Sequence, residues 1–126
     1  MDKKKYTQTL QVKKVSRSIL MILAAFWFGF SLFSGAESFG GGWRGLLANS
    51  PNALPWLALL IFVYFSWTYE IISGALITAE GIFTLFFFDA FNSLFVLLTI
   101  SLPILLLGFS LLVTGYLTRK PDDPPA

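Results

Sequence analysis

The sequence predicts an all-α fold, a polytopic membrane protein whose four transmembrane helices form an antiparallel bundle. Of its 126 residues, 56% are hydrophobic and only 13% are charged, whereas a soluble domain carries about 25% charged residues. Four apolar runs are each long enough to cross a bilayer as a helix, which takes about 20 residues. Strands of a membrane barrel would alternate apolar and polar residues, and these runs do not.

The predicted spans make one transmembrane domain over residues 18–117. An uninterrupted helix over 53–88 would be about 54 Å long, which exceeds the thickness of any bilayer. We therefore expect a tight turn at Thr68–Ser73, where aromatic residues flank Glu70 in the manner of a membrane surface. The four spans, in order, are residues 18–35, 53–69, 71–88 and 94–117.

The basic residues predict the orientation of the chain. Eight of the nine Lys and Arg residues precede the first span or follow the last, and only Arg44 lies between. Loops rich in Lys and Arg stay in the cytoplasm, and an even number of spans returns the chain to its starting side. We expect a multi-pass protein of the cell membrane with both termini cytoplasmic. In the alternative interpretation, the first apolar stretch is a cleavable signal peptide ending near Ser34–Ala36.

Three segments lie outside the predicted spans. Residues 1–17 are a short basic cytoplasmic segment that sets the topology, and they lack the interleaved aromatic residues of a nucleic-acid site, so we expect no nucleic-acid partner. Residues 36–52 are the outer loop, and its three glycines at 40–42 are followed by no Gly-Lys-Ser/Thr motif, which excludes a P-loop. Residues 118–126 are expected to be a disordered cytoplasmic tail.

Glu80 is the one residue that does not fit its surroundings. It lies near the middle of the third span, with about 12 Å of hydrocarbon between it and either surface. An ionised carboxylate is costly there, and an intramembrane carboxylate is a functional-site candidate by default. Because no Lys, Arg or His lies inside a predicted span to pair with it, we expect Glu80 to be protonated at neutral pH.

The helical repeat predicts the surroundings of Glu80. Gly74, Thr78 and Gly81 share a face of small residues suited to close helix packing, and Glu80 lies at its edge. Three roles stay open for its carboxyl group: a neutral group that joins helices by a hydrogen bond, a proton or cation relay, or a contact with a partner protein. The candidate hydrogen-bond donors at similar depth are Trp27, Tyr64, Ser101 and Ser110.

Three other polar or irregular positions have structural explanations. Glu70 and Asp89 bracket the third span about 28 Å apart, so both are expected in headgroup water. Pro103 is expected to kink the fourth span, where a hydroxyl group such as that of Thr99 can satisfy the freed carbonyl.

Residues from the end of the second span to the fourth carry a resemblance, which covers the four spans. Trp67–Gly74 contains an aromatic pair, an acidic residue and two small residues, Gly81 follows seven residues later, and Pro103 lies five residues before a glycine. This pattern resembles an uncharacterised family, a domain of unknown function, of small prokaryotic four-helix integral membrane proteins. The resemblance implies four helices and supplies no activity. Ser73 and Glu80 depart from it, because the family has Gly and an apolar residue at those positions.

The composition excludes several classes of function. With no Cys and no His, the chain has no disulfide, no Cys/His zinc site and no Ser-His catalysis. No second catalytic group lies at the depth of Glu80, so we expect no enzyme, catalytic residue, metal or cofactor.

The first functional expectation is a small structural or accessory protein of the lipid bilayer. Such a protein packs against itself as a homo-oligomer or against a larger membrane complex. The alternative is a minimal proton-coupled transporter or exchanger that uses Glu80. Small multidrug exporters also have four helices and one essential intramembrane Glu, although that residue lies in their first helix.

Overall fold

A computed structural model describes residues 2–120, and all the secondary structure in that range is helical. Residues 121–126 of the predicted tail lie outside the described residues. Within the described range, four helical stretches are long and apolar enough to cross a membrane: Lys3–Ser34, Gly42–Phe65, Glu70–Phe87 and Leu94–Leu117. The prediction of an all-helical chain with four such stretches is confirmed.

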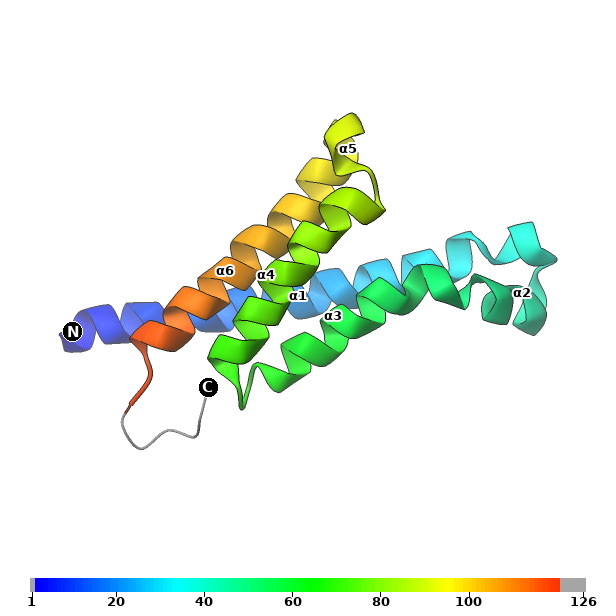
Figure 1. Ribbon diagram of the computed structural model, residues 1–126. Helices are drawn as coiled ribbons and strands as arrows, with labels where there is room; N and C mark the ends of the chain where they lie inside the picture. The colour runs from blue at the N-terminus through cyan, green and yellow to red at the C-terminus, as the bar shows by residue number, and fades with distance from the viewer. Residues whose placement is uncertain (1, 121–126) are drawn as a thin grey trace.

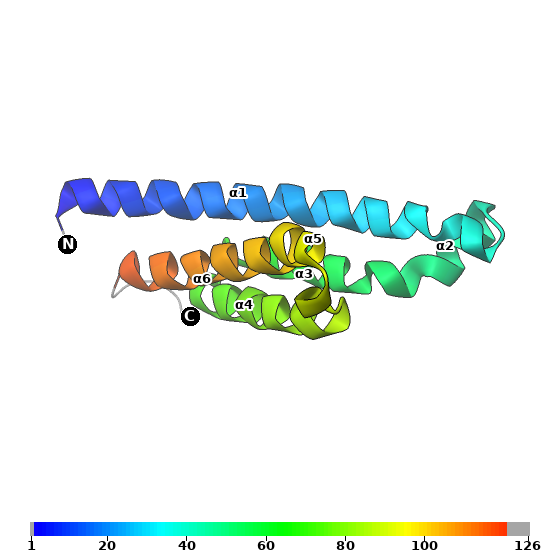
Figure 2. The ribbon, with the colours of Figure 1, turned by 90° about the horizontal axis from the view of Figure 1, so that it is seen from above.

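The first helical hairpin pairs α1 (Lys3–Ser34) with α3 (Leu54–Phe65). Three short helices connect them, namely η1 (Ala36–Phe39), α2 (Gly42–Asn49) and η2 (Ser50–Ala53). The predicted outer loop therefore contains helical structure. Figure 2 shows that α1 is the longest element and that its N-terminal end extends past the end of α6.

The second hairpin pairs α4 (Glu70–Phe87) with α6 (Leu102–Leu117). The connection contains η3 (Ala90–Asn92), α5 (Leu94–Val96) and the π-helical segment η4 (Leu97–Ser101). Figure 1 shows that the two hairpins lie close together at the turn between α3 and α4 and diverge towards α2 and α5.

Each of the four long helices contacts two others, in the cyclic order α1, α3, α4 and α6. Their shared interior is a single cluster of apolar side chains that pack against one another. The buried core residues are Leu20, Ala24, Trp56, Leu59, Val63, Ile77, Ile100, Ile104 and Leu111.

The turn between the hairpins lies at residues 66–69 and thus begins before the predicted Thr68–Ser73. Helix α3 ends at Phe65, and the amide of Ser66, its C-cap residue, donates to the carbonyl of Phe62 (3.1 Å). Arg17 of α1 then donates to the carbonyl of Ser66 (2.9 Å), which satisfies a carbonyl group at the helix end. Glu70 therefore opens α4, where a negative charge suits the helix dipole.

Pro103 does not lie inside a regular helix. It occupies the first turn of α6, where it supplies no amide hydrogen to the continuous helical stretch Leu94–Leu117. The π-helical segment η4 directly precedes it, and the amide of Leu102 donates to the carbonyl of Leu97. The Thr99 hydroxyl donates to the carbonyl of Phe95 (2.6 Å). The irregularity expected at Pro103 therefore takes the form of a widened helical turn.

Candidate functional site

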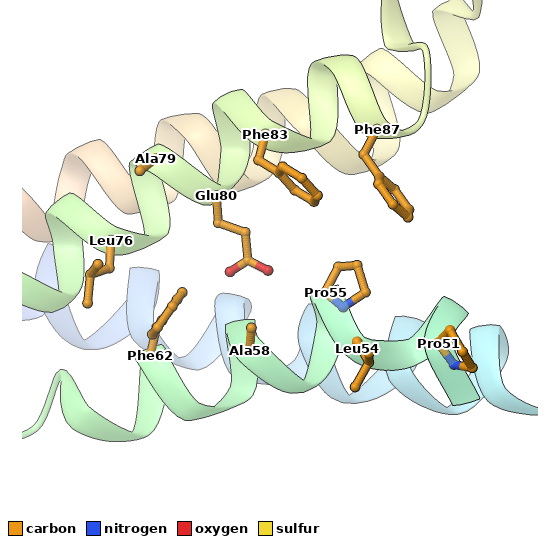
Figure 3. A pocket seen from close by; sticks show the side chains of 10 residues that line it. All are labelled: Pro51, Leu54, Pro55, Ala58, Phe62, Leu76, Ala79, Glu80, Phe83 and Phe87. Carbon is orange, nitrogen blue, oxygen red and sulfur yellow. The ribbon is translucent and has the colours of Figure 1, made fainter. Parts of the chain in front are cut away.

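A groove of about 530 Å³ lies between α3 and α4, where the hairpins begin to diverge. The residues of α3 and α4 that line it are apolar apart from Glu80. Figure 3 shows Glu80, Phe83 and Phe87 pointing from α4 towards α3, and Pro55, Ala58 and Phe62 pointing back towards α4. The lining residues are Pro51, Leu54, Pro55, Ala58, Phe62, Leu76, Ala79, Glu80, Phe83 and Phe87.

The Glu80 side chain points from α4 into this groove, towards Ala58 of α3 (Figure 3). Only 8% of Glu80 is exposed, and its Oε2 atom is buried without a hydrogen-bond partner among the described residues. A buried polar group usually has a partner, because leaving it unpaired is costly. The groove therefore places one unsatisfied carboxyl group in apolar surroundings.

The four predicted donors are engaged elsewhere or directed away. Ser101 shares a hydrogen bond with Thr84 (2.9 Å), and Ser110 shares one with Ser16 (3.0 Å). Tyr64 is 69% exposed. The Trp27 ring stacks on Trp56 at 5.7 Å between ring centroids. The interhelical hydrogen bond expected of Glu80 is thus absent from the part of the chain that the structure describes.

The small-residue face of α4 lies against α6. A methyl group on Gly74 would lie 2.5 Å from the Leu112 amide nitrogen, and one on Gly81 would lie 2.8 Å from Cγ of Leu105. The Thr78 backbone faces Gly108 of α6 in the same way. The glycines therefore let the backbones of α4 and α6 approach closely, and this contact orients Glu80 away from α6.

A second group of polar residues gathers where the hairpins meet. Lys13 Nζ lies 2.7 Å from Glu70 Oε1 and donates to the Thr118 hydroxyl (3.0 Å). Arg17 Nε donates to the Ser66 hydroxyl (2.9 Å), and Arg17 Nη2 lies 3.7 Å from Glu70 Oε1. We call Lys13, Arg17, Ser66, Glu70 and Thr118 the ion-pair cluster, and it joins all four long helices.

The ion-pair cluster is largely removed from solvent. Lys13 and Arg17 are buried, and Arg17 also lies over the ring of Trp67, 4.7 Å from its centroid, in a cation–π arrangement. Two cations share one carboxylate here, so the cluster keeps a positive excess. A buried charge costs free energy unless an opposite charge pairs with it. Glu70 is the only carboxylate of the ion-pair cluster, so both cations depend on it.

Sequence reasoning placed Glu70 in headgroup water and missed its partners. The signal was present in the spacing of α1, because Lys13, Arg17, Leu20 and Ala24 recur at intervals of four, three and four. That spacing defines one face of a helix, and all four residues are buried. The predicted first span begins at residue 18, so it leaves Lys13 and Arg17 in the basic segment.

Comparison with known families identifies the relatives of this chain. A model of a domain of unknown function, DUF7670, matches residues 4–122. The chain belongs to the DUF7670 family. No curated protein and no solved structure matches it.

Two polar features of this DUF7670 member are candidates for a functional role, namely the ion-pair cluster and Glu80. Among the described residues, no group of three or more His, Cys, Asp or Glu side chains can hold a metal ion. The ion-pair cluster consists of mutually bonded groups at a helix junction, which is a structural arrangement. Glu80 is different because its carboxyl group faces an open groove without a partner, so it is the stronger candidate for binding.

Proposed function

We propose that this DUF7670 chain is a multi-pass integral membrane protein whose four helices cross the cell membrane as an antiparallel bundle. Both termini lie in the cytoplasm in this proposal. The distribution of Lys and Arg supports it, because eight of nine lie before the first stretch or after the last. The ion-pair cluster would then lie at the cytoplasmic end, and the groove would open towards the outer half of the bilayer.

Cysteine labelling tests this topology, and the chain is suited to it because it has no native Cys. Single Cys residues are introduced at Lys4 in α1 and at Arg44 in α2, both of which are exposed. A membrane-impermeant maleimide added to intact cells is expected to label the Cys at 44 and to spare that at 4. Labelling of the Cys at 4 in intact cells would contradict the proposal.

Within this topology, we propose that the protein acts as a minimal proton-coupled exchanger with Glu80 as the shared binding group. The observation that carries the proposal is the unpartnered carboxyl group of Glu80, directed into a groove of ligand size. One carboxyl group can hold a proton or pair with a substrate, and each occupant excludes the other. No chemical reaction is part of this proposal, which agrees with the expectation of a protein without catalytic residues.

The shape of the protein supports exchange between the two sides. The hairpins lie close together at the turn between α3 and α4 and diverge towards α2 and α5 (Figure 1). If the hairpins rock about their contact, the divergent end would change sides. Such rocking is the usual route to alternating access in small transporters.

Proton flux in proteoliposomes tests the exchanger. Vesicles that trap a pH-sensitive dye are exposed in turn to cationic, neutral and anionic amphiphiles. We expect one of these classes to drive proton flux with the wild type and not with Glu80→Gln, which keeps the size of the side chain. Asp89→Asn is the matched control, since Asp89 is exposed outside the groove. Absence of flux with every class, or equal flux with Glu80→Gln, would contradict exchange.

A structural or accessory role is the second candidate, and the open side of the same groove favours it. Leu54, Phe83 and Phe87 line the groove and remain about half exposed, so a second copy or a larger membrane complex has an apolar surface to cover. A photoreactive residue at Phe83 would then give dimer adducts with purified protein, and one at Ile22 of α1 would give none. Monomer alone from both positions would count against self-association.

A further inference from the structure

We propose that the Glu80 groove selects hydrophobic organic cations that carry a single positive charge. This inference rests on the proposed exchange function and names its substrate class. It follows from the charge, the lining and the size of the groove.

The charge of the occupant follows from what surrounds Glu80. The helical elements packed against α4 are α3, α6, η3 and η4, and none of them carries a charged side chain over its described length. Their titratable groups are Tyr64 and Tyr116, which are 69% and 71% exposed. On α1, Lys13 and Arg17 are bonded within the ion-pair cluster. The carboxylate of Glu80 therefore lacks a cation of its own chain, and an occupant with one positive charge supplies it.

The lining of the groove requires the rest of the occupant to be apolar. Apart from Glu80, the lining consists of Pro, Ala, Leu and Phe side chains, which offer no hydrogen-bonding group to a polar ligand. A strongly hydrated ion such as Na⁺ would lose its water and gain one carboxylate ligand, because no second acidic residue lines the groove. Phe62, Phe83 and Phe87 add aromatic rings to the lining, which suits a cation whose charge is spread over a hydrophobic body.

The size of the groove agrees with a small molecule. Its volume of about 530 Å³ lies within the usual range of about 300 to 1,000 Å³ for sites of small organic ligands. The groove is lined by α3 on one side and α4 on the other (Figure 3), and Leu54, Phe83 and Phe87 of its lining are about half exposed, so a hydrophobic ligand has an apolar way in.

Proton balance links this binding to exchange. When the cation binds, the protonated Glu80 carboxyl group releases its proton to water, and the resulting carboxylate pairs with the cation. No bond other than the O–H bond breaks, and no electron transfer is involved. Because the proton and the cation compete for the same group, the affinity for the cation rises with pH until proton competition ends.

Two rigid ions of the same shape and opposite charge test the inference. Tetraphenylphosphonium and tetraphenylborate are titrated into the purified full-length protein in nanodiscs, and binding and proton release are measured together. We expect the wild type to bind the phosphonium ion, to release about one proton for each ion bound, and to bind the borate no better than empty nanodiscs do. Glu80→Gln is expected to weaken phosphonium binding about 30-fold or more, because a paired charge is lost from a buried site.

Two further variants keep the result interpretable. Ala58→Phe fills the groove opposite Glu80 and retains the carboxyl group, so we expect it to lose phosphonium binding although it remains folded in thermal unfolding. Asp89→Asn removes a carboxylate outside the groove and is expected to bind as the wild type does. Equal phosphonium binding by the wild type and Glu80→Gln, or equal binding of the two ions, would overturn the inference and would leave the groove as a site for lipid chains.

The outcome separates this inference from the proposed function. Phosphonium binding through Glu80 without proton flux in vesicles supports the cation site and contradicts exchange. Glu80-dependent flux driven by neutral or anionic amphiphiles alone supports exchange and contradicts the cation site.

Discussion

The Lys13 ammonium lies 2.7 Å from the Glu70 carboxylate, although 57 residues separate them in the sequence. This contact joins the N-terminal part of α1 to the first residue of α4. It brings the basic N-terminal segment into the helical bundle, where it has a packing role in addition to any role in topology.

Replacement of Glu70 by Gln is expected to destabilise the protein. The change leaves Lys13 and Arg17 buried without an anion, which should cost about 1 to 3 kcal/mol. Reversible unfolding in mixed micelles measures the free energy. The double variant Lys13→Met/Glu70→Gln should lose less than the sum of the two single variants, because the second change removes one of the stranded charges. Strict additivity would show that the 2.7 Å contact is energetically unimportant.

Two glycine-to-alanine substitutions are expected to have opposite effects. Gly74→Ala puts a methyl group 2.5 Å from the Leu112 amide nitrogen, so α4 and α6 must separate, at a cost of about 1 to 3 kcal/mol. Gly29→Ala meets nothing within 4 Å and should be neutral or stabilising by up to about 1 kcal/mol, because alanine favours a helix interior. Unfolding of both variants under the same conditions provides the comparison, and similar effects would refute the close α4–α6 contact.

Asn49 is expected to hold the C-terminal end of α1. Its Nδ2 atom donates to the carbonyls of Ser31 (2.6 Å) and Leu32 (2.7 Å), which lie in the last turn of the helix. In Asn49→Asp the donor becomes an acceptor that faces two other acceptors, so we expect a loss of about 1 to 3 kcal/mol. Ser50→Ala removes an exposed hydrogen bond and serves as the control with little effect. Thermal unfolding of both variants checks this, and an unchanged Asn49→Asp would disprove the capping role.

The hydroxyl pair of Thr84 and Ser101 is expected to couple α4 to the π-helical segment η4. The two oxygens lie 2.9 Å apart and are buried. A double-mutant cycle with Thr84→Val and Ser101→Ala should give a coupling of about 0.6 kcal/mol, the average for such bonds in a membrane protein. A coupling within error of zero would mean that each hydroxyl is satisfied by its own helix, as Thr84 also donates to the carbonyl of Gly81.

The apolar runs predict the long helices. For the fourth helical stretch both ends are correct, because the predicted span 94–117 coincides with Leu94–Leu117. Hydrophobic length is a local property, so it can be read from one segment at a time. The turn lies at 66–69, before the predicted Thr68–Ser73. The carbonyl of Ser66 at the end of α3 accepts a hydrogen bond from Arg17, a partner too remote in sequence to be read from the local pattern.

The candidate site could be predicted only in part. Glu80 was identified because a carboxyl group in an apolar run is anomalous in any arrangement of helices. Its surroundings depend on how far α3 and α4 diverge. The helical repeat of the sequence gives no information on that distance. The same limit applies to Glu70, whose partners come from a helix that continues beyond its apolar part. Pairing between distant segments is decided by packing, and one sequence gives little information on it.

The ion-pair cluster also has a consequence for biosynthesis. Lys13 binds Thr118 across 105 residues, so the cluster cannot close until the final helix has left the ribosome. Until then, two cations near the start of the chain lack their full set of partners. A chain truncated before Thr118 would leave Lys13 without this hydrogen-bond acceptor.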